Sequence, residues 1–114
     1  MIKSFEDIEV WKKAQKATLD IYQAFRLNKD FSLRDQIQRA SVSVSNNIAE
    51  GYERQGNKEF KKFLFIAKGS SAEVRSMLYL SHELKYINSE QCNKLLDQYR
   101  EISRMISAFI KALQ

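Results

Sequence analysis

The fold class depends on how one reads Arg39-Ala40-Ser41-Val42-Ser43-Val44-Ser45-Asn46-Asn47-Ile48-Ala49-Glu50-Gly51. Serine and valine alternate in the middle of this segment, as they do in a short strand with one buried face. However, Ile37, Val44 and Ile48 recur at helical steps through the same residues, with Ala40 or Ser41 filling the position between them. Since the flanking sequence offers no partner strand, the segment is predicted to be helical.

Composition extends the helical prediction to the rest of the chain. The 114 residues contain no proline and three glycines, and Lys, Glu, Gln, Leu, Ile and Ala are abundant, which favours helices over sheets. A chain of this length forms one domain and buries about two thirds of its unfolded surface. We therefore expect a single all-α domain covering residues 1–114.

Capping signals and short turns divide the chain into four predicted helices, at about 5–27, 33–54, 57–86 and 89–113. Ser4 is a candidate N-cap for the first helix, Ser32 with Asp35 resembles a capping box for the second, and Asn88 or Ser89 caps the fourth. Gly56 marks the turn before the third. Turns this short make consecutive helices antiparallel neighbours, so the predicted architecture is an up-down-up-down four-helix bundle.

The predicted helices contain more apolar residues than one buried stripe on each helix requires. The clearest of these are Phe65, Ile66, Met105 and Ile110. They fit a helix-lined interface between subunits, and they fit equally well a bundle core that is slightly wide. The pattern by itself leaves both interpretations open.

A set of polar residues in the second and third helices resembles an active site. Its members are Arg39, Asn47, Glu50 and Glu73. Carboxylates beside an arginine can perform acid-base chemistry, but the same groups can form a buried hydrogen-bonded network that fixes helix register. We favour the structural interpretation. It predicts that Glu50→Ala costs about 3 kcal/mol of stability if its charged partner stays buried.

Other catalytic arrangements are not apparent. The single histidine, His82, has Tyr79 three residues before it, whereas a di-iron bundle needs Glu at that position. Cys92 lies on the apolar seam of the fourth helix and is read as a small buried residue. No cysteine and histidine spacing fits zinc, and no glycine loop fits a phosphate. We therefore expect no enzyme activity, no metal and no cofactor.

Positive charge is predicted to concentrate at one end of the bundle. The net charge is +5, and the turn between the second and third helices shares its end with both termini. The candidate nucleic-acid-binding residues there are Lys12, Lys13, Lys16, Arg54, Lys58, Lys61 and Lys62. Such a cluster can bind phosphates, or it can be an ordinary solvated turn whose charges are offset by neighbouring carboxylates. Among nearby aromatic residues, Tyr52 is the best candidate to stack on a base.

Several motifs resemble a known family. They are Val10-Trp11-Lys12-Lys13-Ala14, Gln36-Ile37-Gln38-Arg39-Ala40, Ser43-Val44-Ser45-Asn46-Asn47-Ile48-Ala49-Glu50-Gly51 and Ile66-Ala67-Lys68-Gly69-Ser70, with Arg54, Lys58-Glu59-Phe60, Phe63-Leu64 and Glu73. The chain resembles the four-helix-bundle 23S rRNA intervening-sequence proteins. This family is related to the accessory variability proteins of diversity-generating retroelements.

The resemblance carries expectations about assembly and partners. It implies a homopentameric ring with a suspected role in binding RNA or DNA, and no established enzymatic activity. The alternative function is a protein-interaction scaffold, for example an accessory protein of a reverse transcriptase. Because Cys92 is the only cysteine and the chain begins with no export signal, we expect a cytoplasmic location. The apolar runs are too short to span a membrane.

Overall fold

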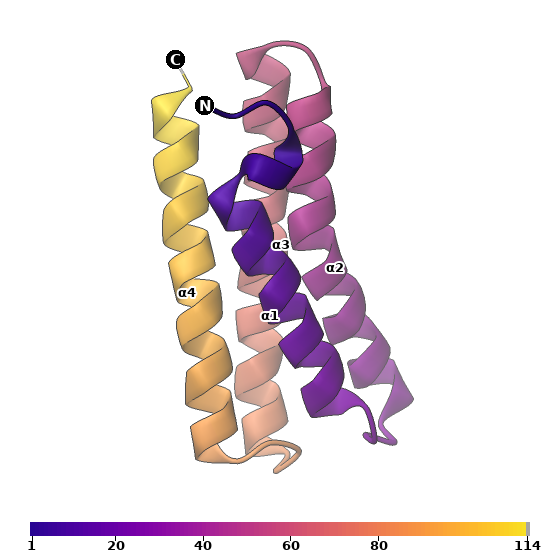
Figure 1. Cartoon of the computed structure of the whole chain (residues 1–114). Helices are drawn as coiled ribbons and strands as arrows, with labels where there is room; N and C mark the ends of the chain where they lie inside the picture. The colour runs from indigo at the N-terminus through magenta and orange to yellow at the C-terminus, as the bar shows by residue number, and fades with distance from the viewer. Residues whose placement is uncertain (114) are drawn as a thin grey trace.

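The computed structural model describes residues 1–113, which contain four helices and no strand. The helices are α1 (Glu9–Phe25), α2 (Phe31–Glu53), α3 (Asn57–Glu83) and α4 (Ser89–Ala112), preceded by a short 3-10 helix, η1 (Phe5–Asp7). They run alternately up and down in an elongated bundle (Figure 1) of 43 × 21 × 20 Å. α1 and α3 occupy opposite corners, each packed against α2 and α4. The all-α prediction is confirmed.

Two of the predicted helix starts are wrong. The first helix was expected to run unbroken from about residue 5, but Ile8 has an extended backbone (φ −78°, ψ 118°) that separates η1 from α1. Ser32 does not cap α2. Instead Asp30 is the N-cap, and its carboxylate accepts a hydrogen bond from the Leu33 backbone N–H at 3.1 Å, an interaction available to any capping carboxylate.

The start of α4 follows its sequence signal. The Asn88 side chain accepts from the Gln91 backbone N–H at 2.7 Å, and the Gln91 side chain accepts from the Asn88 N–H at 3.0 Å. This is a reciprocal capping box, so Asn88 rather than Ser89 is the N-cap. Its two hydrogen bonds fix the point where α4 begins.

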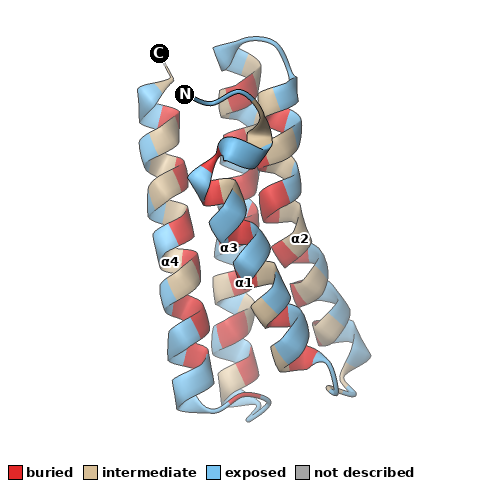
Figure 2. Cartoon of the chain, in the orientation of Figure 1, coloured by how far each residue is buried: buried red, intermediate tan, exposed pale blue. Residues whose placement is uncertain are grey.

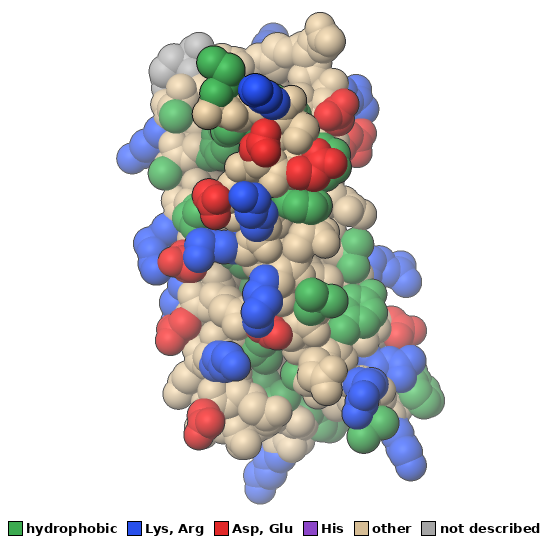
Figure 3. All heavy atoms as spheres, in the orientation of Figure 1, with side chains coloured by type: hydrophobic (Ala, Val, Ile, Leu, Met, Phe, Trp, Pro, Cys, Tyr) green, Lys and Arg blue, Asp and Glu red, His purple; other side chains and the backbone are tan. Residues whose placement is uncertain are grey.

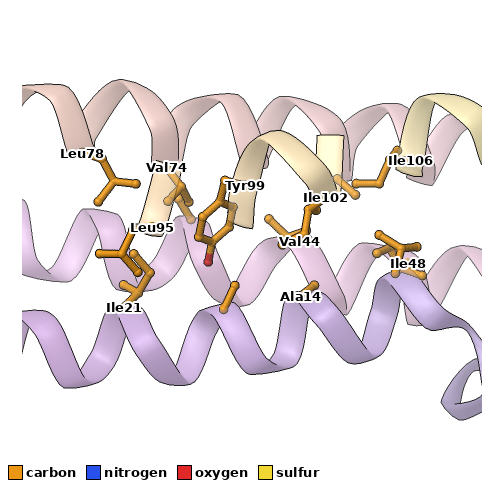
Figure 4. Packing of buried hydrophobic residues seen from close by; sticks show 14 of the residues in the cluster. Ala14, Ile21, Val44, Ile48, Val74, Leu78, Leu95, Tyr99, Ile102 and Ile106 are labelled. Atoms are coloured by element: carbon orange, nitrogen blue, oxygen red, sulfur yellow. The ribbon is translucent and has the colours of Figure 1, made fainter. Parts of the chain in front are cut away.

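The core is a continuous apolar cluster along the bundle axis. Figure 2 shows buried residues on the inward faces of all four helices and exposed residues on their outward faces. The largest buried side chain is Tyr99, whose ring lies among Val44, Val74 and Ile102 (Figure 4). Among residues 1–113, no helix is long and apolar enough to cross a bilayer.

Small residues bring α2 and α3 unusually close. Gly51 of α2 is buried, and a Cβ atom placed on it would lie 2.6 Å from Cβ of Phe63 and 3.0 Å from Cδ1 of Phe60. Farther along the same contact, the hydroxyls of Ser43 and Ser70 are 2.8 Å apart. At this distance the two serine hydroxyls form their hydrogen bond with each other, between the helices, rather than with solvent.

Of the four apolar residues in excess of the seam, two join the core. Ile110 is buried at 9% exposure, and Met105 packs against the core cluster. Phe65 and Ile66 are 55% and 47% exposed on the outside of α3. The wide-core interpretation therefore describes Met105 and Ile110, whereas Phe65 and Ile66 have no partner within the described chain.

Candidate nucleic-acid interface

The three predicted lysines of α1 are paired with carboxylates. Lys12 contacts Glu9 at 3.3 Å, Lys13 contacts Glu101 of α4 at 3.4 Å, and Lys16 contacts Asp20 at 2.8 Å. Figure 3 shows this face of the bundle, where basic and acidic side chains are interspersed. A phosphate approaching α1 would therefore meet nearly compensated charge.

Asp20 illustrates how tightly this face is compensated. Partial burial acts to raise the pKa of its carboxyl, but hydrogen bonds from Lys16 and Gln98 outweigh burial, so the pKa is lowered overall. The carboxylate is thus held ionised beside Lys16. Lys16 is accordingly a poor candidate for binding an external anion.

The turn between α2 and α3 divides into paired and unpaired cations. Arg54 contacts Glu50 at 2.9 Å and Glu59 at 4.0 Å, and Lys62 contacts Glu59 at 3.6 Å. In the described residues, the side chains of Lys58 and Lys61 have no carboxylate within 4.0 Å. Of the seven predicted cations, these two carry charge that the chain does not offset.

A hollow of about 440 Å³ lies at this turn, lined by Tyr52, Glu53, Arg54, Gln55, Gly56, Asn57 and Phe60. Gly56 adopts φ 113°, a conformation that favours glycine. It is followed by the first N–H groups of α3, which no side chain caps. The uncapped N-terminus of a helix carries partial positive charge. Tyr52 packs edge-on against Phe60 at 5.9 Å between ring centroids, so its ring is only partly available for stacking.

The predicted buried network of Arg39, Asn47, Glu50 and Glu73 does not form as a unit within one chain. Arg39, Glu50 and Glu73 are exposed. Glu50 pairs along its own helix with Arg54, and Asn47 donates to the Ser43 carbonyl oxygen at 2.8 Å. The helical spacing was read correctly, but Arg39, Glu50 and Glu73 are exposed rather than buried between helices, and only Asn47 is partly buried. The large cost expected for Glu50→Ala loses its basis.

Arg39 and Glu73 stand on the two sides of a groove between α2 and α3. The groove has a volume of about 360 Å³ and is lined by Asp35, Gln36, Arg39, Ala40, Ser43, Glu73 and Met77. Within the described residues neither Arg39 nor Glu73 has an ion-pair partner. They are therefore free to pair with charges on another molecule.

The residues considered for catalysis occupy structural positions. His82 lies within hydrogen-bonding distance of the Ser89 hydroxyl, at 3.0 Å, at the turn between α3 and α4. Cys92 is 4% exposed, and burial raises the pKa of its thiol, which disfavours the nucleophilic thiolate. In the described part of the chain, no three His, Cys, Asp or Glu side chains are grouped to hold a metal ion.

The outer surface of α3 carries small or apolar residues at helical spacing, interrupted by Glu73. We call these residues the outer stripe: Ile66, Gly69, Ser76 and Leu80, all exposed. A Cβ atom placed on Gly69 would meet nothing within 4 Å. Glycine in a helix interior costs about 1 kcal/mol relative to alanine. The contacts within one chain give no reason for that cost.

Some cations that lack carboxylate partners were not among the predicted site residues. Lys68 and Arg75 lie on α3, and Arg104 lies on α4. The sequence signal that could have identified the first two is their seven-residue spacing from each other and from Lys61. That spacing returns to the same helix face after two turns.

Comparisons with known proteins agree with this architecture. A sequence model of the 23S rRNA-intervening sequence protein family matches residues 6–108. The chain is also similar to the crystal structure of a protein of unknown function from the S23 ribosomal protein family of Bacteroides thetaiotaomicron. The TM-score is 0.84 at 27% sequence identity, covering 90% of this chain and 98% of that one. A search of curated proteins finds no match. Neither description names an enzymatic activity.

Proposed function

The chain belongs to the 23S rRNA-intervening sequence protein family, and on this premise we propose that it binds RNA or DNA as a homo-oligomer without enzymatic activity. The observation that carries the proposal is the uncompensated charge at the start of α3. Lys58 and Lys61 have no carboxylate partner among residues 1–113, and they stand beside the uncapped N-terminus of the helix. Phosphate groups suit such a surface because they pair with lysine charges and accept hydrogen bonds from the free N–H groups at the start of a helix.

Binding at this end would rest on charge rather than on base recognition. Lys58 and Lys61 act as point charges, and the guanidinium of Arg54 is already engaged by Glu50 and Glu59. Each phosphate contact releases counterions, so affinity would fall steeply as salt is raised. Selectivity would then come from the shape of the nucleic acid or from a partner protein.

The proposed assembly is a homopentameric ring, supported by the outer stripe of α3. Ile66 and Leu80 expose apolar surface, and Gly69 would allow another helix to approach closely. On the opposite corner of the bundle, α1 exposes Leu19 (68%) and Tyr22 (43%). Two different apolar surfaces on opposite sides of one chain suit a head-to-tail contact, which closes into a ring.

A second candidate function is a scaffold for a different protein, such as the reverse transcriptase of a diversity-generating retroelement. The same outer stripe favours it, together with Arg39 and Glu73, which are available to pair across an interface. We also propose a cytoplasmic location, in keeping with a single buried cysteine that forms no disulfide.

The test is fluorescence anisotropy with labelled structured RNA and DNA over a salt series, with the oligomeric mass measured by light scattering in the same buffers. We expect binding that weakens steeply with salt and a mass of five chains. The variant Lys58→Glu with Lys61→Glu should bind more weakly. Lys12→Glu with Lys13→Glu, which changes the net charge equally on the compensated face, should lose less. Absence of binding at the lowest salt would favour the scaffold.

A further inference from the structure

Three cations on α3 share one face at a regular interval. Lys61, Lys68 and Arg75 are each separated by seven residues. At 1.5 Å per residue, they stand about 10 Å apart and together span about 21 Å of the helix. Seven residues are close to two full turns, so all three lie along the same edge of α3.

Cations of α4 lie beside this edge of α3. Hydrogen bonds define how the two antiparallel helices align: Ser71 and Ser103 hydroxyls lie 2.8 Å apart, and Arg100 Nη2 donates to the Tyr79 hydroxyl at 2.8 Å. In this alignment Arg104 lies near the level of Lys68, and Lys111 near that of Lys61. The helical spacing of Arg100, Arg104 and Lys111 places all three toward α3. The basic row is defined as Lys61, Lys68, Arg75, Arg100, Arg104 and Lys111.

Four of the six cations in the basic row lack a carboxylate partner within the described chain. Lys61, Lys68, Arg75 and Arg104 have no carboxylate within 4.0 Å, and Arg100 has one, Asp97, at 3.2 Å. The Nε–H of Arg75 is buried and lacks an acceptor. This contrasts with α1, where all three predicted lysines are paired. Positive potential is therefore greater along α3 and α4 than on the opposite side of the bundle.

Two aromatic rings are exposed along the same part of α3. Phe65 is 55% exposed and Tyr79 is 53% exposed, and helical spacing puts both just outside the line of cations. The hydrogen bond from Arg100 of α4 holds the Tyr79 hydroxyl where α3 and α4 meet. Neither ring contributes to the core. Cations with interleaved exposed aromatics are the combination that binds single strands, because phosphates pair with the former and bases stack on the latter.

We propose that the surface formed along α3 and α4 by the basic row, Phe65 and Tyr79, which we call the α3–α4 surface, binds single-stranded nucleic acid. Phosphates would lie along the cations and bases would stack on the two rings. The inference rests on the proposed function and extends its binding site from Lys61, at the start of α3, along α3 and α4. A single strand fits better than a duplex, since duplex bases are already stacked and leave the two rings without a role.

The charge test compares two triple variants of the full chain. The first variant alters the basic row and combines Lys68→Glu, Arg75→Gln and Arg104→Glu. The second variant is the control and combines Lys3→Glu, Arg26→Gln and Lys29→Glu. It changes the net charge by the same amount, at cations that have no carboxylate partner in the described chain. The probe is a labelled oligouridine of about ten nucleotides, within the site sizes of single-strand grooves.

Fluorescence anisotropy over a salt series measures the affinity of each variant and its dependence on salt. Loss of three phosphate contacts should reduce the slope of log affinity against log salt by about 2, from about 0.7 per contact on a single strand. Affinity should fall about tenfold or more, while the control triple keeps nearly the wild-type slope. Circular dichroism confirms that both variants are folded.

The stacking test separates a base from an apolar protein partner. Phe65→Leu and Tyr79→Leu keep apolar surface but remove the rings, and each should weaken binding about tenfold. Phe65→Tyr and Tyr79→Phe keep the rings and should bind as the wild type does. If leucine were tolerated as well as an aromatic residue, the stacking role would be wrong.

The outcomes separate this inference from the proposed function. No binding of any nucleic acid by the wild type at the lowest salt would refute both. Binding by the wild type with equal losses in the two triple variants would leave the proposed function intact and refute binding at the α3–α4 surface. Tighter binding of a matched duplex than of the single strand would overturn the choice of ligand, and capture of an acidic protein in place of oligouridine would do the same.

Discussion

Gly51→Ala should destabilise the bundle even though alanine is the better helix former. The added Cβ would lie 2.6 Å from Cβ of Phe63, 3.0 Å from Cδ1 of Phe60 and 3.4 Å from its carbonyl oxygen. Carbon atoms pack best at about 3.5 to 4.0 Å. Cβ of Phe63 is fixed to its backbone, so a change of rotamer cannot relieve this contact, and α2 and α3 must separate.

The magnitude follows from two opposing effects. Overpacking a core costs about 1 to 3 kcal/mol, and the fixed position of the Phe63 Cβ places this case near the upper end. Replacing glycine by alanine in a helix returns about 1 kcal/mol. We therefore expect a net loss of about 2 kcal/mol. For a chain of this size, each kcal/mol lowers the melting temperature by about 4 °C.

Gly69→Ala is the matched control, because its Cβ would meet nothing within 4 Å. That variant should gain about 1 kcal/mol from helix propensity alone. Urea denaturation of both variants, monitored by circular dichroism under identical conditions, measures the difference directly. If Gly51→Ala proved as stable as Gly69→Ala, the close approach of α2 and α3 would be refuted.

Three further predictions concern the side chains of Glu50, Tyr99 and Asp20. Glu50→Ala should change the free energy of unfolding by less than about 1 kcal/mol, because its pair with Arg54 is exposed; a loss near 3 kcal/mol in urea titration would restore the buried network. Tyr99→Phe should be neutral or stabilising in thermal melts. The hydroxyl beside it, that of Thr18, donates to the Ala14 and Ser41 carbonyl oxygens, which leaves the buried Tyr99 hydroxyl without a well-formed hydrogen bond in the described chain; a marked drop in melting temperature would contradict this. The lowered pKa of Asp20 gives stability that is present above its ordinary value and lost as the pH falls below it. Between about pH 4 and pH 2, wild type should therefore lose more stability than Asp20→Asn, and parallel curves would show that the ion pair with Lys16 contributes nothing.

Much of the fold could be read from the sequence because helical periodicity reports burial directly. Ile37, Val44 and Ile48 repeat at helical steps, and all three are fully buried. The errors occurred where local chemistry allows more than one solution. Asp30 and Ser32 can both cap a helix, and the choice depends on where the chain turns after Phe25.

The candidate site was harder to predict because pairing between helices depends on their rotation. Lys13 looked available until Glu101, distant in sequence, proved to lie 3.4 Å from it. Conversely, Lys68 and Arg75 did not stand out in a sequence rich in charge, although their spacing is regular. Whether a cation is compensated depends on the neighbouring helix as much as on its own.

The most direct test of binding at the α3–α4 surface is photo-crosslinking of the wild-type chain to a single-stranded oligonucleotide carrying 5-bromouridine, followed by mass spectrometry of the peptides. The account predicts crosslinks on α3 between Lys61 and Tyr79, centred on Phe65 and Tyr79, and their loss when unlabelled single strand is added in excess. Crosslinks confined to α1, or to the turn between α2 and α3, would contradict it.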